Sequence, residues 1–331
     1  MNSYPAVTII GAGIIGSSIA WRLAQAGVRV RLVDSGKMGG EASWAGAGML
    51  APGGEFTELS WWISMAIESH HLYAPFVEEL ERESGRTIDF RICGAVETPE
   101  SPSGWLALLD RAGRQRAMGI ASTSDEASVR YPDDSSVDPR DVVAALRLVL
   151  ERLGVDIVEN SPTAEVESGG MQALVIAAGA WSSSLRVLYN GRAVALPEAF
   201  PVKGHLLGYR MQAGSLDTIL RRGHTYILQR SNGFTIAGSN EEDAGFDRHV
   251  DPEVCAALHQ KAAALWPELE GHAPEEQWIG FRPGSRSGEP VIGRCEGSNV
   301  WLAYGHYRNG ILMAPVTARR IAAEIIGHSL S

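Results

Sequence analysis

The feature that most constrains the fold is a glycine-rich turn near the start of the chain, Gly11-Ala12-Gly13-Ile14-Ile15-Gly16. It follows a short apolar run, Val7 to Ile10, and precedes a segment with apolar residues at helical spacing that ends at Gly27. The alternating run Val28 to Val33 then predicts a second strand, which is followed by Asp34. This order of strand, glycine turn, helix and strand predicts a β-α-β unit of the Rossmann type.

Each part of this unit has a role in binding a dinucleotide. Gly11 permits the tight turn, Gly13 lets the backbone approach a pyrophosphate, and Gly16 lets the helix pack close to the strand. The start of the helix supplies N–H groups and the positive end of the helix dipole. The Asp34 carboxylate can accept hydrogen bonds from ribose hydroxyls, which favours a free 2′-hydroxyl and disfavours NADP. The alternative, a glycine turn that binds nothing, requires all of these features to coincide by accident.

Composition excludes several other classes of protein. The 331 residues are 45% hydrophobic and 21% charged, which is typical of a soluble globular chain with about two domains. The net charge of −10 opposes binding to nucleic acid. The three cysteines have no metal-binding or redox spacing, and no apolar run is long enough to span a membrane. Because the first residues also lack the basic region of a signal peptide, we expect a cytoplasmic protein.

The rest of the chain shows helical and then strand-like patterns. Apolar spacing predicts helices over 59–83, 105–118 and 139–153 and strands at 155–158 and 173–176. Short alternating strands follow at 205–209, 225–229 and 234–237, a pattern typical of an antiparallel sheet. We therefore predict an α/β fold in which a Rossmann-like domain is joined to a second domain built on an antiparallel sheet.

A second small-residue segment, Gly39 to Leu50, separates FAD from NAD as the expected cofactor. It comes soon after the second predicted strand and contains four glycines and three alanines. Such a loop can lay its backbone against a flat ring, and Ser43 within it can bond a phosphate. Because an NAD enzyme has no need of this loop, the segment favours FAD.

At this point the chain resembles the glycine oxidase branch of the D-amino acid oxidase superfamily. The motifs that carry the resemblance keep their order and cover most of the chain. They are Met38-Gly39-Gly40, Ala47-Gly48-Met49-Leu50, Val137-Asp138-Pro139, Val175 to Trp181, Pro201-Val202-Lys203-Gly204, Tyr226 to Arg230, Gly280-Phe281-Arg282-Pro283-Gly284 and Gly305 to Leu312. The resemblance implies the two-domain fold of D-amino acid oxidase and glutathione reductase. Its FAD-binding domain would comprise 1–85, 138–198 and 280–331, and its substrate-binding domain 86–137 and 199–279.

The resemblance also assigns the substrate side of the site. Arg282 would pair with the substrate carboxylate, which suits a planar guanidinium that binds carboxylate in a bidentate manner. The alternative for this arginine is a structural ion pair. Tyr226 would contact the same carboxylate through its hydroxyl, although an aromatic residue in a strand is more often part of the core. Arg308 is carried over as a further substrate-side residue, while His224 and His306 are expected to be structural histidines.

The β-α-β unit and the resemblance together indicate the residues that contact the cofactor. They are Gly11, Gly13, Ile14, Ile15, Gly16, Asp34, Ser35, Ala42, Ser43, Ala47, Gly48, Met49, Val166, Gly179, His306, Tyr307, Arg308, Asn309, Gly310, Ile311 and Leu312. Asn309-Gly310 opens the last predicted helix, whose N-terminus would stabilise negative charge on a reduced flavin. No cysteine lies near Arg282, where related sarcosine oxidases attach their flavin, so we expect non-covalent FAD. We expect no metal.

The activity implied by the resemblance is the oxidative deamination of glycine or another small amine or D-amino acid. It would proceed by hydride transfer to flavin N5, with dioxygen as the electron acceptor, and would give the 2-oxo acid, ammonia and hydrogen peroxide. A role in making the thiazole of thiamine is implied as well. With no dedicated base, kcat/KM should rise with pH. Two alternatives stay open. The first is a dehydrogenase that oxidises a D-amino acid, sarcosine or proline and passes the electrons to an acceptor other than dioxygen, and the second is a non-catalytic FAD-binding module. Assembly into a homo-oligomer is possible as well.

Overall fold

The predicted β-α-β unit is present in the computed structural model, which describes residues 7–170 and 172–329. It consists of β1 (Val7–Ile10), α1 (Ile14–Gln25) and β2 (Val30–Val33), with the two strands parallel. A Cβ on Gly11 would lie 2.5 Å from the carbonyl carbon of Ala177, and one on Gly16 would collide with the carbonyl oxygen of Gly11. The glycines therefore let turn, helix and strand touch. The residues at the very start of the chain, 1–6, on which the expectation of no signal peptide depends, lie outside the described residues.

The unit belongs to a six-stranded sheet with the order β19-β20-β11-β1-β2-β9. Its other strands are β9 (Asp156–Val158), β11 (Ala173–Ile176), β19 (Val291–Arg294) and β20 (Val300–Tyr304). All neighbours pair in parallel except β19 and β20, which are antiparallel. The strands predicted at 155–158 and 173–176 are thus confirmed as members of this sheet.

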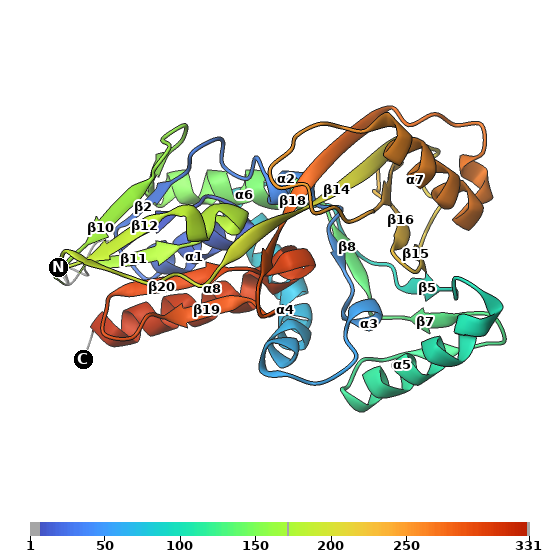
Figure 1. Ribbon diagram of the computed structural model, residues 1–331, viewed down its shortest axis with the longest axis horizontal. Coiled ribbons are helices and arrows are strands. Elements are labelled where there is room, and N and C mark those ends of the chain that lie inside the picture. Colours follow the sequence, from blue (N-terminus) through green and yellow to red (C-terminus); the bar gives the residue numbers. More distant parts are fainter. Residues whose placement is uncertain (1–6, 171, 330–331) are drawn as a thin grey trace.

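This sheet is the middle of three layers (Figure 1). Alternate residues such as Ile9, Leu32 and Val175 belong to the core shared with the helices, of which α1 packs on α6 (Pro139–Arg152) and on α8 (Gly310–Ser329). The intervening residues, among them Ile10 and Leu174, pack instead with a second cluster. That cluster includes residues of a three-stranded sheet of β10 (Glu165–Ser168), β12 (Arg186–Tyr189) and β13 (Arg192–Ala193).

A second large sheet has eight strands in the order β18-β14-β17-β16-β15-β5-β7-β6. They are β5 (Ala95–Glu97), β6 (Thr123–Ser124), β7 (Val129–Tyr131), β14 (Ala199–Arg210), β15 (Ile219–Arg222), β16 (Thr225–Gln229), β17 (Phe234–Gly238) and β18 (Glu276–Ser285). The antiparallel strands predicted at 205–209, 225–229 and 234–237 correspond to β14, β16 and β17. The longest pairing joins β14 to β18, from Ala199 opposite Ser285 to Gly208 opposite Glu276.

Two helices lie beside this second sheet (Figure 1). α7 (Pro252–Leu265) contributes Cys255, Leu258 and Ala262 to a core cluster with Leu207 and Ile227 of the sheet. α5 (Trp105–Ala117) lies near the other end, beside β7. The helices predicted over 105–118 and 139–153 are confirmed as α5 and α6, with ends shifted by one residue.

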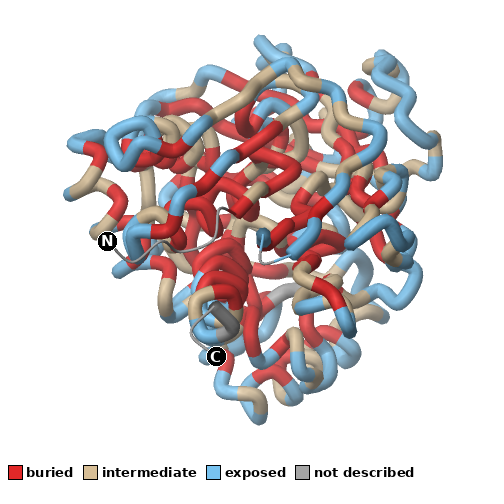
Figure 2. The backbone as a smooth tube through the Cα atoms, turned by 90° about the vertical axis from the view of Figure 1, so that its left-hand side faces the viewer, coloured by how far each residue is buried: buried red, intermediate tan, exposed pale blue. Residues whose placement is uncertain are grey.

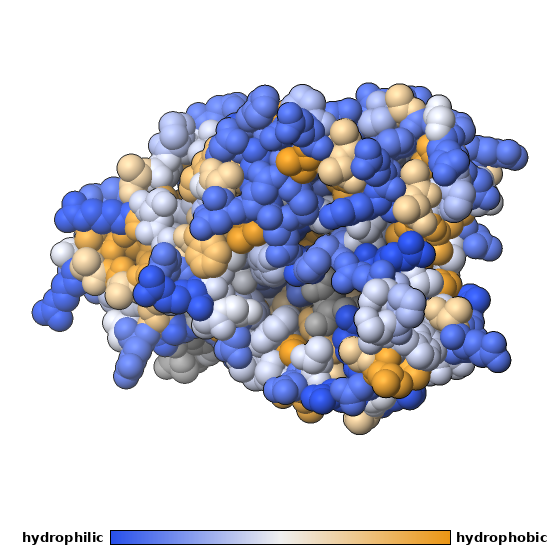
Figure 3. Space-filling model, turned by 45° about the vertical axis from the view of Figure 1, so that its right-hand side comes forward, coloured by the Kyte–Doolittle hydropathy of each residue, from blue (hydrophilic) through white to orange (hydrophobic). Residues whose placement is uncertain are grey.

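The helix predicted over 59–83 is α4 (Trp61–Ser84), and it ends where Gly85 adopts a left-handed conformation with φ 71°. α4 packs on α8, and the Ser69 hydroxyl donates to the carbonyl oxygen of Leu312 at 2.7 Å. Figure 2 shows the buried residues concentrated in the sheets and along the last helix. In the view of Figure 3 the surface is mostly hydrophilic, with hydrophobic patches separated from one another. None of the described helices is long and apolar enough to cross a membrane.

Candidate functional site

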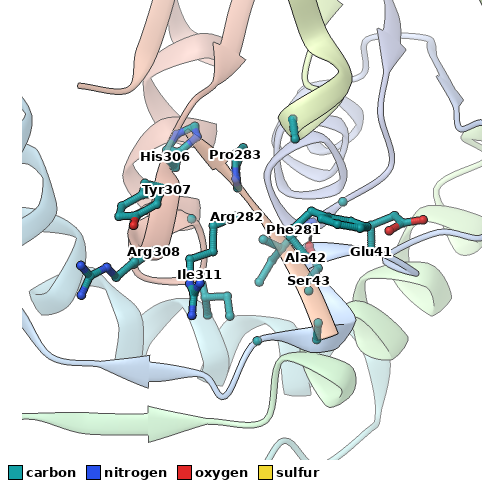
Figure 4. A pocket seen from close by; sticks show the side chains of 18 of the residues that line it. Glu41, Ala42, Ser43, Phe281, Arg282, Pro283, His306, Tyr307, Arg308 and Ile311 are labelled. Atoms are coloured by element: carbon teal, nitrogen blue, oxygen red, sulfur yellow. Dashed lines mark hydrogen bonds between the residues drawn. The ribbon is translucent and has the colours of Figure 1, made fainter. Parts of the chain in front are cut away.

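A cavity of about 1000 Å³ lies between the two large sheets and is lined from both. Its walls include the glycine turn, the end of β2, the segment 39–51, part of β18 and the start of α8. Figure 4 shows side chains from these separate parts of the sequence gathered in one place. This volume is at the upper limit of ordinary ligand pockets, so it accommodates a large cofactor with a small substrate better than a small ligand alone.

The glycine turn is held in shape by one carboxylate and one hydroxyl. The Asp34 Oδ2 atom accepts from the Ala12 amide at 2.7 Å, and its Oδ1 atom accepts from the Gly36 amide at 2.8 Å. Ser43 Oγ accepts from the Ile14 amide at 2.9 Å, so Ser43 lies at the start of α1. The first amides of a helix have no acceptor within it, and this end of α1 lines the cavity.

The small-residue segment after β2 contains the short helix α2 (Ala42–Ala45) and the strand β3 (Met49–Leu50). Trp278 Nε1 donates to the Ala45 carbonyl oxygen at 2.9 Å, and the buried Arg230 donates to that of Ala47. Burial lowers the pKa of Arg230, whereas the charge of Asp138 raises it. A Cβ on Gly48, which has φ 77°, would collide with the Val137 carbonyl oxygen. The segment is therefore fixed against the second sheet with its backbone along the cavity.

Arg282 enters the cavity from β18 and is held by neutral groups. Its Nη2 atom donates to Ser239 Oγ at 2.6 Å, and its Nη1 atom donates to the carbonyl oxygens of Asn240 at 3.1 Å and Lys203 at 3.5 Å. In the described part of the chain no carboxylate forms an ion pair with it. The described residues thus provide no structural ion pair for Arg282, and its positive charge is available to an anionic ligand.

Arg308 lies in the 3₁₀ helix η4 (Tyr307–Asn309), directly before α8, and has a carboxylate partner. Its Nη2 atom lies 2.8 Å from Glu241 Oε1, and both side chains are about one third exposed, at 32% and 34%. Burial raises the pKa of the neighbouring Tyr307, and a hydrogen bond to Glu241 raises it further. Glu241 therefore contacts two residues of η4 at the edge of the cavity.

Tyr226 and His306 occupy different surroundings in the cavity wall. The Tyr226 ring lies against Gly238, where a Cβ would be only 2.6 Å from Tyr226 Cζ, and it is half-buried. His306 is buried, with Nε2 3.2 Å from Thr317 Oγ1, and its burial lowers the pKa to about 3. His306 is therefore neutral at physiological pH and has a side-chain partner, as expected of a structural histidine. His224 also lines the cavity.

Residues 239–251, which include the partners of both arginines, are tied to β14 along their length. Lys203, only 2% exposed, and Glu242 exchange two backbone hydrogen bonds, of 3.0 and 2.9 Å. The Lys203 Nζ atom also donates to Asp247 Oδ2 at 2.7 Å. Further along, the Asp251 amide donates to His205 Nε2 at 3.0 Å. We call residues 239–251 the tethered loop.

Most of the predicted site residues line this one cavity. The substrate-side residues Arg282, Tyr226 and Arg308 all do so, and among the predicted cofactor residues only Gly16, Val166 and Leu312 do not. Gly16 packs beneath the turn, and Val166 in β10 pairs with Val187 in β12. The nearby residues 161–164 line the cavity instead.

Sequence reasoning did not identify Ser239, Asn240 and Glu241 as residues of the site. The signal for them was a run of polar residues directly after the buried strand β17. That run shows that the chain leaves the sheet there, but it does not show which arginine the residues contact.

The cavity fits the predicted dinucleotide. The open start of α1 suits a pyrophosphate, and Asp34 beside it lies at the end of β2, where a ribose binds in Rossmann folds. The start of α8 lines another part of the same cavity. Among the described residues, no group of three or more His, Cys, Asp or Glu side chains could hold a metal ion.

Comparison with known proteins agrees with this geometry. A family model described as "DAO: FAD dependent oxidoreductase" matches residues 6–324. The glycine oxidase of Bacillus subtilis (strain 168) is 31% identical, and the alignment covers 100% of this chain and 95% of that protein. The bifunctional protein ThiO/ThiG of Synechocystis sp. is 33% identical over 100% of this chain. The chain spans only about half of that bifunctional protein, 53% of its length.

Comparison with solved structures also finds a glycine oxidase. The crystal structure of glycine oxidase from Geobacillus kaustophilus superposes with a TM-score of 0.90 at 27% sequence identity. The superposition covers 97% of this chain and 94% of that protein. The similarity therefore extends over the six-stranded sheet, the eight-stranded sheet and the cavity between them.

Proposed function

The chain belongs to the DAO family of FAD-dependent oxidoreductases, and on this premise we propose that it acts as a glycine oxidase. It is an FAD-dependent amino acid oxidase that converts glycine or a similarly small amino acid to the 2-oxo acid, ammonia and hydrogen peroxide. The relatives of nearly equal length carry the name glycine oxidase. The alternatives, another dehydrogenase or a non-catalytic FAD-binding module, are not favoured.

The observation that carries the proposal is the charge of Arg282. Its guanidinium lines the same cavity as the dinucleotide-binding turn, and among the described residues its hydrogen bonds go only to neutral acceptors. A partly buried cation without a counter-ion is a site for an anion, and a guanidinium binds a carboxylate through two parallel hydrogen bonds. An amino acid is the small substrate that brings such a carboxylate together with an oxidisable amine.

We assign FAD to the residues that line the cavity. The start of α1 and Ser43 would face the pyrophosphate, Asp34 the ribose, and the segment 42–49 with the start of α8 the flavin ring. When bound, FAD supplies the two-electron oxidation of the carbon–nitrogen bond. We propose that it is bound non-covalently, which is supported by the lack of cysteine among the described residues that line the cavity.

The chain's own contribution to the reaction is to orient the substrate. Arg282 would hold the carboxylate, with Tyr226 beside it, so that the α-carbon faces the flavin. His306 does not serve as a base, because burial lowers its pKa to about 3 and its Nε2 atom faces Thr317. The substrate would therefore enter with its amine deprotonated, which gives a kcat/KM that rises with pH.

The proposed function has further parts. We propose the domain division stated above, which is supported by the separate six-stranded and eight-stranded sheets, although its boundary at residue 280 falls within β18. A role in thiamine thiazole synthesis is supported by the ThiO/ThiG relative. A cytoplasmic location, dioxygen as the acceptor and assembly into a homo-oligomer also belong to the proposal.

The test is Arg282→Ala in the flavin-loaded protein. We expect the purified variant to keep the yellow flavin spectrum but to lose anaerobic bleaching by glycine, because the carboxylate is no longer held. Arg286→Ala is the matched control, since that arginine lies four residues away and its side chain is 84% exposed. If Arg282→Ala is bleached by glycine as fast as the unmodified protein, the assignment is wrong.

A further inference from the structure

Arg282 and Arg308, two of the arginines that line the cavity, reach it from different elements and differ in their charge environment (Figure 4). Arg282 on β18 is held by one hydroxyl and two carbonyl oxygens, all neutral. Arg308 in η4 lies 2.8 Å from the Glu241 carboxylate. Among the described residues, Arg282 therefore has no carboxylate partner, whereas Arg308 already has a counter-ion.

A single short segment produces this difference. Ser239 and Asn240 supply neutral oxygens to Arg282, and Glu241, the next residue, supplies a carboxylate to Arg308. Because these three residues follow one another in the tethered loop, the partners of both arginines are positioned together. The position of Glu241 therefore decides which of these two arginines has a carboxylate counter-ion.

We propose that Glu241 determines specificity by neutralising Arg308, which restricts the site to substrates with a single carboxylate. This inference rests on the proposed function, in which Arg282 binds the substrate carboxylate. A second carboxylate on the ligand has to displace Glu241 from Arg308 and is repelled by its charge. Discrimination by repulsion of the unwanted ligand is a common route to specificity.

The ion pair is better placed for this role than for stabilising the fold. Both side chains are about one third exposed, and ion pairs of such exposure contribute little to stability. Glu241→Gln keeps the shape of the side chain and can still accept the hydrogen bond from Tyr307. We therefore expect the variant to fold, bind flavin and differ mainly in the charge beside Arg308.

The experiment measures binding of unreactive acids to the flavin-loaded protein through the change in flavin absorbance. Acetate serves as the monocarboxylate, and malonate, succinate and glutarate serve as dicarboxylates of increasing length. The unmodified protein is compared with Glu241→Gln. Glu198→Gln is the matched control, because Glu198 also pairs with an arginine, Arg286 at 2.9 Å, but does not line the cavity.

We expect Glu241→Gln to bind at least one dicarboxylate roughly twofold to fivefold more tightly than the unmodified protein does, an effect sized for a partly exposed charge pair. Acetate affinity should change less than twofold, and Glu198→Gln should change neither. An equal gain in affinity for acetate and the dicarboxylates would overturn the inference, because it would reflect only the loss of one negative charge from the cavity. An unchanged dicarboxylate affinity would overturn it as well.

The double variant Glu241→Gln/Arg308→Met tests whether the effect acts through Arg308. The gain in dicarboxylate affinity should disappear in it, and a gain that persists without Arg308 contradicts the inference. Failure of the proposed function would give a different result. The unmodified protein would then not oxidise glycine, and Arg282→Ala would bind acetate as tightly as the unmodified protein does. If the unmodified protein oxidises glycine but Glu241→Gln does not change the selectivity between mono- and dicarboxylates, only the inference about Glu241 is wrong.

Discussion

Gly204 and Arg282 share a space in which only one of them can carry a side chain. A Cβ on Gly204 would lie 2.5 Å from Nη2 and 2.7 Å from Cζ of Arg282. The two residues lie on β14 and β18, which are adjacent antiparallel strands with Gly204 opposite Gly280 and Val202 opposite Arg282. The guanidinium can therefore lie across β14 only because position 204 has no side chain.

Gly204→Ala should displace the Arg282 guanidinium and weaken substrate binding. Losing a charge-assisted carboxylate contact predicts a fall in kcat/KM for glycine of about tenfold to a hundredfold. The flavin content should be unchanged, since Gly204 is not among the residues assigned to FAD above. Steady-state kinetics and the absorbance spectrum of the purified variant measure the two quantities.

Gly113→Ala is the matched control for this change. Gly113 lies in α5, where an added Cβ would have its nearest neighbour at 3.8 Å, and alanine is the better helix former. Its kinetics should equal those of the unmodified protein. Normal glycine kinetics in Gly204→Ala would show that the position of the Arg282 guanidinium does not limit catalysis.

Asp34→Ala should weaken flavin binding rather than substrate binding. The carboxylate holds the glycine turn through the Ala12 and Gly36 amides, and its loss leaves both donors without this acceptor. We expect the Kd of FAD for the apoprotein to rise by about tenfold or more, measured by quenching of flavin fluorescence. Asp156→Ala is the control, because Asp156 lies in the same sheet with a side chain that is 61% exposed. Equal Kd values for both variants would argue against a role for Asp34.

His306→Gln should change how stability depends on pH. Burial lowers the pKa of His306 from 6.5 to about 3, so between these values the unfolded chain binds more protons than the folded one. This histidine therefore contributes stability that is present above pH 6.5 and is lost as the pH falls towards 3, a loss of about 2 kcal/mol at pH 5.

The measurement is the free energy of unfolding of the flavin-loaded protein at pH 7 and pH 5. The difference between the two values should be smaller by about 2 kcal/mol in His306→Gln than in the unmodified protein. His272→Gln, which changes an exposed histidine, should keep the original difference. An unaltered difference in His306→Gln would mean that the buried ring is not the group that titrates.

Local patterns in the sequence were sufficient to predict much of the fold. The glycine turn depends on steric rules that act within a few residues, and so does the end of α4 at Gly85, where φ is 71°. The pairing of β5 with β15 could not be predicted in this way, because it joins residues more than 120 positions apart. Such long-range pairing is decided by how the whole chain packs, which periodicity does not report.

The candidate site shows the same division. Arg282 could be predicted because its motif, Gly280 to Gly284, resembles a known family. The role of Glu241 could not, because it depends on a distance of 2.8 Å to Arg308, which lies 67 positions further along the chain. Val166 was predicted from the resemblance, and that residue lies in a strand outside the cavity lining.

The tethered loop has a consequence for the energetics of ligand capture. Apart from an isolated bridge at Glu242, residues 239–251 form neither helix nor strand, and segments of this kind usually lose conformational entropy when a ligand orders them. Here Lys203 and His205 already hold the loop in place. An incoming amino acid therefore contacts a preorganised cavity wall, and its affinity is not reduced by the entropy cost of ordering this loop.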